Sequence, residues 1–255
     1  MRTEHRLDGP ADGPSITLSH ALGATRHLWD DVAPALAGQY RLLRYDTRGH
    51  GGSEVPPGPY TLAQMAEDVV ELLDALGIAR THFVGMSMGG LIAMQLALSH
   101  PSRVQSLVLC DTTACYGESR RGMWEERIQI AETAGMTEEL IERTMEIWFT
   151  EAYRSAEKAR VDRVRDMLRR TDPRGYVAAI RAIGFVDLTE RLAGIRCPTL
   201  VVVGADDPGT PPSMAQVLVE RIPGARLRIL PAARHAAVIE RAAEFTRLVS
   251  DFVDA

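Results

Sequence analysis

Residues 81–98 read Thr81-His82-Phe83-Val84-Gly85-Met86-Ser87-Met88-Gly89-Gly90-Leu91-Ile92-Ala93-Met94-Gln95-Leu96-Ala97-Leu98. The apolar run at 81–84 is typical of a strand, and residues 90–98 are typical of a buried helix. A sharp turn between them, with no room for a Cβ at Gly85 or Gly89, predicts strained backbone at Ser87. On its own the pattern also fits a glycine-rich turn between two ordinary elements. The rest of the sequence is therefore needed to choose between a functional turn and an ordinary one.

The composition is that of an ordinary globular protein. The chain has 255 residues, 45% hydrophobic and 25% charged, enough for one sizeable α/β domain. No apolar run approaches the roughly 20 residues of a membrane span, and residues 1–6 lack the apolar segment of a signal peptide. Three scattered cysteines form neither a disulfide framework nor a zinc pattern. Such cysteines fit a reducing cytoplasm, where we expect the protein to lie. With a net charge of −5 and no apolar span, we expect neither nucleic-acid nor membrane partners.

Strand-like and helix-like segments alternate in the first part of the chain, and strands return near its end. Residues 62–76 have helical spacing and stop at Gly77, a residue suited to closing a helix. A final amphipathic helix is expected at 242–252. Strands are expected at 15–18, 40–45, 81–84, 106–110, 199–203 and 226–230. This alternation predicts an α/β fold, with a mostly parallel sheet covered by helices on both faces.

The pattern changes near Tyr116. From about 123 to 183 the chain is charged and helical, with breaks at Gly135 and at Asp172-Pro173. We therefore expect a core formed by 1–118 and 190–255, with a helical cap inserted at 119–189. Because open α/β sheets place their sites at the carboxyl ends of the strands, the cap is expected to cover that edge. The alternative is a helical excursion packed elsewhere.

Acidic and basic side chains follow two later strands. Asp206 and Asp207 come directly after the strand at 199–203, and His235 follows the strand at 226–230. A serine hydroxyl is a poor nucleophile near neutral pH and needs an adjacent base. A Gly-x-Ser-x-Gly turn between strand and helix, followed by an acid and then a histidine, resembles the nucleophile elbow and triad of the α/β-hydrolases.

This resemblance implies a role for each residue. Ser87 attacks a carbonyl, His235 takes its proton and later activates water, and Asp207 fixes the tautomer of the imidazole. Asp207 is preferred to Asp206 because the family places its acid three residues after the glycine found here at Gly204. Dehalogenases and epoxide hydrolases of this fold carry an aspartate at the elbow instead. The sequence has no metal-ligand cluster and no dinucleotide glycine pattern, so neither a metal nor a cofactor is expected.

The resemblance also implies two backbone donors for the oxyanion. One is the N–H of Met88, at the N-terminus of the helix after the serine. The other, by position, is the N–H of Leu22, in the loop after an early strand. His20 in that loop is expected to brace it. His50, in the segment 46–53, is expected to be structural as well.

A closer resemblance runs over nearly the whole chain, including the cap. Several segments are similar to the 3-oxoadipate enol-lactonases: residues 44–51, 55–61, 73–78, 85–90, 124–128 and 143–149. The resemblance implies attack by Ser87 on a five-membered enol-lactone that carries a carboxylate. The ring then opens to an acyl-enzyme and an enolate, and the product is 3-oxoadipate, in the beta-ketoadipate pathway of aromatic-compound breakdown. Two stretches depart from the family: His20-Ala21 stands in place of Asn-Ser, and residues 236–240 are less polar.

An anionic lactone in a protein of net charge −5 needs a local cation. Arg127, beside Trp124 in the cap, is the candidate for the substrate carboxylate, with a solvated helix arginine as the alternative. Trp29, Trp124, Trp148 and Met88 are candidates for lining an apolar pocket. Core packing is the alternative for each of the four.

Other functions fit the same residues. A general carboxylesterase, a cofactor-free perhydrolase and a carbon–carbon bond hydrolase all use such a triad. A ligand-binding receptor that keeps hydrolase residues with little turnover is the alternative of another class, against which the intact triad argues. The expected partner is a small anionic lactone or ester, and the sequence leaves monomer and homodimer open.

Overall fold

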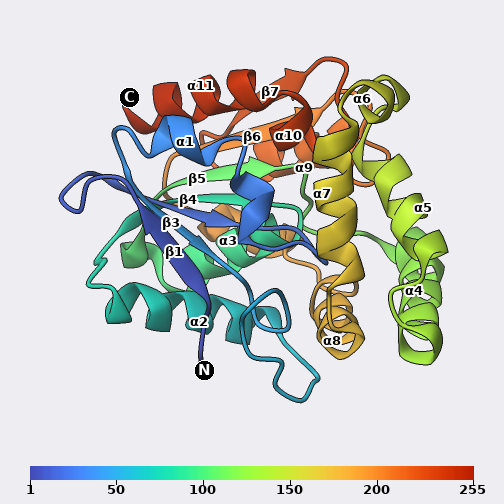
Figure 1. The fold of residues 1–255 in the computed structure, drawn as a ribbon. Helices are drawn as coiled ribbons and strands as arrows, with labels where there is room; N and C mark the ends of the chain where they lie inside the picture. Colours follow the sequence, from blue (N-terminus) through green and yellow to red (C-terminus); the bar gives the residue numbers. More distant parts are fainter.

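The computed structural model describes residues 1–255 and contains one seven-stranded sheet (Figure 1). The order of its strands is β1-β3-β2-β4-β5-β6-β7. β1 runs antiparallel to β3, and every other neighbouring pair is parallel. The strands are β1 (His5–Asp8), β2 (Ser15–Ser19), β3 (Arg41–Tyr45), β4 (Thr81–Met86), β5 (Val104–Cys110), β6 (Thr199–Gly204) and β7 (Arg226–Leu230). The predicted mostly parallel sheet is confirmed.

β1 is the strand that the sequence did not predict. Its residues are mostly exposed, and they pair with β3 at the edge of the sheet, with His5 opposite Tyr45. A strand without a buried face leaves no alternating apolar pattern to read. By contrast, β4 and β6 are buried at every position, which explains their continuous apolar sequences.

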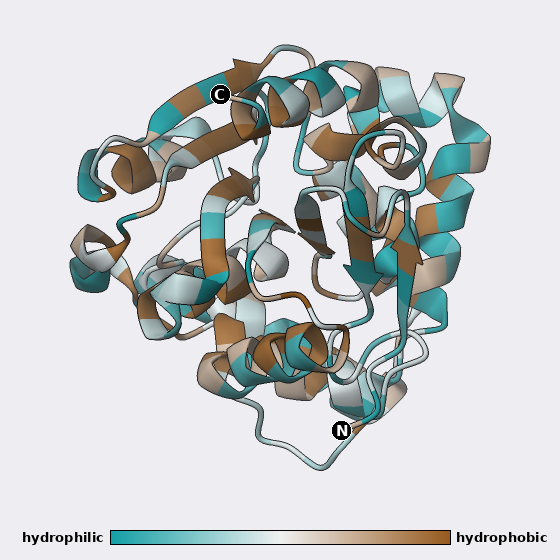
Figure 2. Cartoon of the chain, turned by 90° about the vertical axis from the view of Figure 1, so that its left-hand side faces the viewer, coloured by the Kyte–Doolittle hydropathy of each residue, from teal (hydrophilic) through white to brown (hydrophobic).

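Helices cover both faces of the sheet (Figure 1). α2, α3 and α9 contribute to one buried cluster, and α1, α10 and α11 contribute to the other. These helices are α1 (Ala33–Leu36), α2 (Leu62–Ala75), α3 (Met88–Ser99), α9 (Pro212–Arg221), α10 (Ala237–Glu240) and α11 (Ala242–Val253). Figure 2 shows brown, hydrophobic segments along the interior strands and teal, hydrophilic segments among the outer helices. None of the helices is both long and apolar enough to cross a membrane.

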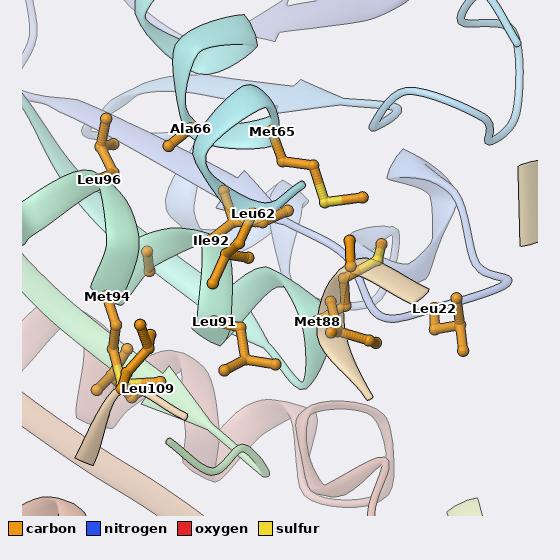
Figure 3. Packing of buried hydrophobic residues seen from close by; sticks show 14 of the residues in the cluster. Leu22, Leu62, Met65, Ala66, Met88, Leu91, Ile92, Met94, Leu96 and Leu109 are labelled. Atoms are coloured by element: carbon orange, nitrogen blue, oxygen red, sulfur yellow. The ribbon is translucent and has the colours of Figure 1, made fainter. Parts of the chain in front are cut away.

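The packing of α2 against α3 shows how sequence signals set the core. The Thr61 hydroxyl accepts from the N–H of Gln64 to begin α2. Gly77, at φ +65, ends it, and the N–H of Ile78 donates to Leu73 O at 2.8 Å, as in a Schellman motif. α3 is buried nearly all round, and Figure 3 shows its apolar side chains beside those of α2. The sequence therefore predicts both helices within a residue or two at each end.

Five helices between β5 and β6 lie together at one end of the sheet (Figure 1). They are α4 (Arg121–Ala134), α5 (Glu138–Trp148), α6 (Glu151–Ala156), α7 (Lys158–Arg169) and α8 (Pro173–Ile183). The predicted breaks are confirmed: Gly135, at φ 74, follows α4, and the Asp172 side chain caps α8. Two further breaks were not predicted: one at Thr150, whose side chain caps α6, and one at Glu157, between α6 and α7. These helices form the inserted cap, while its division from the core at 119–189 stays a prediction.

Candidate active site

Ser87 lies in the turn between β4 and α3, with φ 53 and ψ −111. This left-handed conformation is uncommon for a residue other than glycine. A Cβ at position 85 would lie 2.2 Å from the carbonyl oxygen of Gly89, and a Cβ at position 89 would lie 2.2 Å from that of Ser19. Glycine is therefore required at both positions, and the predicted strained turn is confirmed.

Asp207 and His235 are joined by a hydrogen bond, with Asp207 Oδ2 2.9 Å from His235 Nδ1. The carboxylate also accepts from the N–H of Gly209 at 2.7 Å, the N–H of Thr210 at 3.1 Å and the Thr210 hydroxyl at 2.7 Å. A carboxylate only accepts, so the imidazole proton lies on Nδ1 and Nε2 keeps its lone pair. Nε2 can then take a proton from a hydroxyl group.

The charge on Asp207 is stabilised by these donors. Burial alone raises the pKa of a carboxyl, but here it is outweighed by the charge of His235 and by hydrogen bonds from His235 and Thr210. The pKa of Asp207 therefore lies below its ordinary value, and the side chain is ionised at neutral pH. Asp206, by contrast, is exposed.

Ser87 and His235 line one cavity of about 70 Å³ beneath the cap, together with Leu22, Trp124, Arg127 and Trp148. The chain thus brings together residues from the ends of β2, β4 and β7 and from two cap helices. No hydrogen bond joins Ser87 Oγ to His235 Nε2 in this structure, and in ligand-free enzymes such bonds are often long. The predicted cap over the site is confirmed, because α4 and α5 supply part of the cavity wall.

Tyr116 is a cavity residue that the sequence analysis did not single out. Burial raises the pKa of its phenol to about 12, and a hydrogen bond with the Ser87 side chain opposes this rise. Its ring packs edge to face on Trp124, with centroids 4.9 Å apart. Tyr116 belongs to no motif, and its place after β5 is the only signal that could have pointed to it.

The two predicted oxyanion donors come from separate segments of the chain. Met88 begins α3 directly after the serine, and Leu22 lines the cavity. The N–H of Leu22 donates to no acceptor within the protein. An unpaired N–H on a cavity-lining residue is free to bind a developing oxyanion.

Two of the predicted pocket residues lie elsewhere. The side chain of Met88 is fully buried in the core near Leu22 (Figure 3), because α3 is enclosed nearly all round. Trp29 is fully buried in the cluster on the opposite face of the sheet, with its ring centroid 6.3 Å from that of Phe245. Of the two alternatives for Met88 and Trp29, core packing is therefore the one that holds, and neither residue lines the pocket.

The three predicted cap residues do line the cavity. Arg127 is only 8% exposed, so the alternative of a solvated helix arginine is wrong. Its Nη1 donates to Tyr176 Oη at 3.0 Å and to Thr144 Oγ1 at 3.3 Å, and no carboxylate pairs with it. The ring centroid of Trp148 lies 6.0 Å from that of His235, and Trp124 Nε1 is a buried donor without a partner.

The loop that carries His235 is bonded to the cap. The N–H of Ala236 donates to Trp148 O at 2.8 Å, at the end of α5. The Glu240 carboxylate accepts from the N–H of Arg234 at 2.6 Å, and from the N–H and hydroxyl of Thr150 at 2.8 and 2.7 Å. The junction of α5 and α6 therefore helps to hold His235 in place.

Asp111, at the end of β5, is a second buried carboxyl near the site. It has φ 43, its Oδ1 accepts from the N–H of Gly204 at 2.8 Å, and its Oδ2 has no partner. Burial raises the pKa of Asp111 well above its ordinary value, and the charge of Asp207 raises it further. Burial beside the ionised Asp207 therefore favours the protonated form of Asp111.

This difference makes a prediction for stability. The folded chain keeps the Asp111 proton that the unfolded chain releases, so its contribution makes the free energy of unfolding fall as pH rises above the ordinary aspartate range. One proton corresponds to about 1.4 kcal/mol per pH unit. We expect Asp111→Asn to lose this slope and to be more stable than the parent at pH 7. Denaturant unfolding at pH 5 and pH 7 tests this, with the exposed Asp206→Asn as control, and an unchanged slope in Asp111→Asn would contradict it.

Comparisons with known proteins show the family of the chain. The model of the α/β-hydrolase fold family matches residues 14–242. The chain is 33% identical to 3-oxoadipate enol-lactonase 1 of Acinetobacter baylyi, over 97% of this chain and 91% of the relative. It is 32% identical to RutD of Variovorax paradoxus, a proposed carbamate hydrolase, over 99% of this chain and 96% of the relative.

Two solved structures are similar over almost the whole chain. The enol-lactonase of Burkholderia xenovorans has a TM-score of 0.95 and 40% identity, covering 99% of this chain and 96% of that one. A thermophilic esterase of Thermogutta terrifontis with malate bound has a TM-score of 0.92 and 26% identity, covering 99% and 93%. From its fold, its elbow and these relatives, the chain belongs to the α/β-hydrolase fold family and is a carboxylic-ester hydrolase that resembles the 3-oxoadipate enol-lactonases.

Proposed function

We propose that this enzyme opens the ring of 3-oxoadipate enol-lactone through an acyl-enzyme on Ser87. The observation that carries the proposal is Arg127, a buried arginine with no acidic partner, in the same cavity as Ser87 and His235. Burying a cation without a counter-ion is unfavourable, so such a site is suited to a ligand that brings the negative charge. Similarity to the A. baylyi enol-lactonase supports the same choice.

The reaction begins at the lactone carbonyl. Ser87 Oγ attacks it while His235 Nε2 takes the hydroxyl proton, and Asp207 stabilises the imidazolium that forms. The N–H groups of Leu22 and Met88 bind the oxyanion. The ring C–O bond then breaks, and the enolate oxygen takes the proton from His235. The resulting enol stays tethered to the acyl group and tautomerises to the ketone.

Hydrolysis of the acyl-enzyme completes the cycle. His235 removes a proton from water, the hydroxide attacks the ester carbon, and Ser87 Oγ leaves with the proton from His235. The product carries a new carboxylate beside the serine. An enolate leaves far more easily than an alkoxide, so ring opening asks little of the general acid.

The substrate's own carboxylate is the group that we place against Arg127. The Tyr176 and Thr144 hydroxyls both accept from Arg127 Nη1, and the unpartnered Trp124 Nε1 is a further donor on a cavity-lining residue. The Thermogutta esterase, which was solved with malate, is a relative that holds a small carboxylate ligand. Charge-assisted bonds to a carboxylate of this kind stabilise binding by about 1.5–3 kcal/mol.

We expect Arg127→Met to lower kcat/KM for the enol-lactone about 10- to 100-fold, which corresponds to the loss of about 1.5–3 kcal/mol of binding free energy. Hydrolysis of neutral p-nitrophenyl acetate should change less than about threefold, since this ester has no carboxylate to lose contact with. Loss of ultraviolet absorbance by the lactone and release of p-nitrophenol are the two readouts. Arg143→Met, which removes a solvent-facing arginine paired with Glu126 on the neighbouring helix, is the matched control. Equal losses on both substrates would contradict the role of Arg127.

A second candidate is carbamate hydrolysis, which the similarity to RutD favours. The two functions are separated by offering the enol-lactone, a carbamate and p-nitrophenyl acetate to the same preparation. Turnover of the lactone alone, or far faster than the others, supports the first proposal. If the enzyme hydrolyses the neutral ester but not the lactone, it is a broader esterase. If it binds a ligand but hydrolyses none of the three compounds, it is a receptor.

The proposal places the enzyme in aromatic-compound breakdown in the cytoplasm. Its three cysteines are free thiols, as expected in a reducing compartment. Both a monomer and a homodimer are compatible with a cavity built from one chain.

A further inference from the structure

The loop after β2 carries a peptide group whose two ends face different partners. Ala21 contributes the carbonyl and Leu22 the N–H of this one peptide. In a planar trans peptide the C=O and N–H point in opposite directions, so fixing one fixes the other. Ala21 O accepts from His20 Nδ1 at 2.8 Å and from the N–H of Ala24 at 3.1 Å. His20 thus binds the carbonyl end of the peptide group whose N–H belongs to the cavity-lining residue Leu22.

The tautomer of His20 follows from its other contact. The backbone N–H of Thr47 lies 2.9 Å from His20 Nε2, and a backbone N–H can only donate. Nε2 must therefore be the acceptor, and the proton lies on Nδ1, where it donates to Ala21 O. The Thr47 hydroxyl, 3.2 Å from Nε2, strengthens the same arrangement.

His50 has the same tautomer as His20, and it binds a later residue of the loop after β2. The N–H of Gly23 donates to His50 Nε2 at 3.0 Å, so His50 carries its proton on Nδ1, which lies 3.1 Å from Arg48 O. The two imidazole rings lie 5.3 Å apart, centroid to centroid. Successive backbone groups of the loop are therefore fixed by two rings of known tautomer.

Both rings are buried and uncharged. Burial lowers the pKa of His20, against the opposing charge of Asp46, and it lowers the pKa of His50 to about 3. Neither histidine lines the cavity that holds Ser87. Their chemistry is thus confined to hydrogen bonds with the loop.

We propose that His20 is a positioning residue, whose Nδ1–H sets the direction of the Leu22 N–H and strengthens it as a donor by polarising the shared peptide. Hydrogen bonds in a chain polarise one another, so a proton donated to Ala21 O makes the Leu22 N–H more positive. The proposal rests on the proposed function, because it takes Leu22 as an oxyanion donor. It requires only the serine chemistry and is independent of which ester or lactone is the substrate.

Two isosteric variants separate this role from structural support. His20→Asn keeps a donor where Nδ1 lies but has no atom that reaches Thr47, whereas His20→Gln keeps an acceptor for Thr47 but has no donor at the Nδ1 position. With p-nitrophenyl acetate, we expect kcat of His20→Asn to stay within about threefold of the parent. We expect kcat of His20→Gln to fall about 10- to 100-fold with KM within about threefold, somewhat less than the loss of a whole oxyanion donor. A trifluoromethyl ketone, whose adduct with Ser87 carries an oxyanion, should lose affinity for His20→Gln by a similar factor.

Equal losses in both variants, or unchanged kcat in His20→Gln, would overturn the proposal. A measurement on the parent protein covers the case in which a variant does not fold. The ¹⁵N shifts of the His20 ring should report Nδ1–H from pH 5 to pH 9, and an Nε2–H tautomer would equally overturn it. A parent that hydrolyses neither ester nor lactone overturns the proposed function and this inference together, whereas an ester-active parent that spares the lactone overturns only the substrate.

Discussion

Replacing Ser87 with alanine is expected to lower kcat for the enol-lactone, or for any ester that the enzyme accepts, by about 10⁵-fold or more. The nucleophile makes the covalent bond to the substrate, and neither His235 nor the oxyanion donors can form it. A residual acceleration over water remains from the binding site and the donors around the carbonyl. KM should change little, because the hydroxyl contributes little to ground-state binding.

The matched control is Ser99→Ala. Ser99 lies at the other end of α3 and donates only to the carbonyl of Gln95, at 2.9 Å. Ser99→Ala also removes one serine hydroxyl, but at a residue that does not line the cavity, so its kcat should equal that of the parent. If Ser87→Ala kept more than about 1% of the parent's kcat, another residue would have to be the nucleophile.

Asp207→Asn is expected to lower kcat about 10³- to 10⁴-fold, because it reverses the tautomer of His235. Asp207 Oδ1 accepts from two backbone N–H groups, of Gly209 and Thr210. In the variant the amide oxygen must occupy the position of Oδ1, because an amide nitrogen there would face two N–H donors. The NH₂ group then faces His235 Nδ1, so Nδ1 becomes the acceptor and Nε2 carries the proton. An Nε2–H cannot remove a proton from Ser87.

Asp206→Asn is the matched control for this variant. It makes the same chemical change one residue earlier, on an exposed side chain. Its kcat should stay within about twofold of the parent. A large loss in Asp206→Asn with little loss in Asp207→Asn would mean that the neighbouring carboxylate is the acid.

The parts of the fold that bury an apolar face were predictable from sequence. The strands at 81–86 and 199–204 are buried at every position, and the helix at 62–75 is closed by Gly77, at φ +65. β1 left no such pattern, because it is held by backbone pairing at the edge and its side chains are mostly exposed. Hydrogen bonds between backbone groups can be made by nearly any residue type, so they cannot be recognised from the sequence.

The candidate site divides in the same way. Ser87, Asp207 and His235 were predictable because each must follow a strand that ends at the same edge of the sheet. The cavity wall was harder to predict, since a large apolar residue fits a core and a pocket equally well. Trp29 and Trp148 have the same chemistry and belong to the same buried cluster, and only the packing of the chain places one against Phe245 and the other beside His235. Tyr116 and Asp111 follow a strand without a recognisable motif.

The bonds between the His235 loop and the junction of α5 and α6 restrict how such an enzyme can be redesigned. Replacing the cap with that of another enzyme would change the pocket, and it would also replace the cap groups that now bond to Ala236 and Glu240. Residues 148–150 therefore belong with the catalytic frame, although they lie in the variable insertion. Substrate range is more safely altered along α4, where Trp124 and Arg127 face the cavity without supporting the histidine. In this enzyme the division between residues that hold the catalytic histidine and residues that shape the pocket lies within the cap, and not at its boundary with the core.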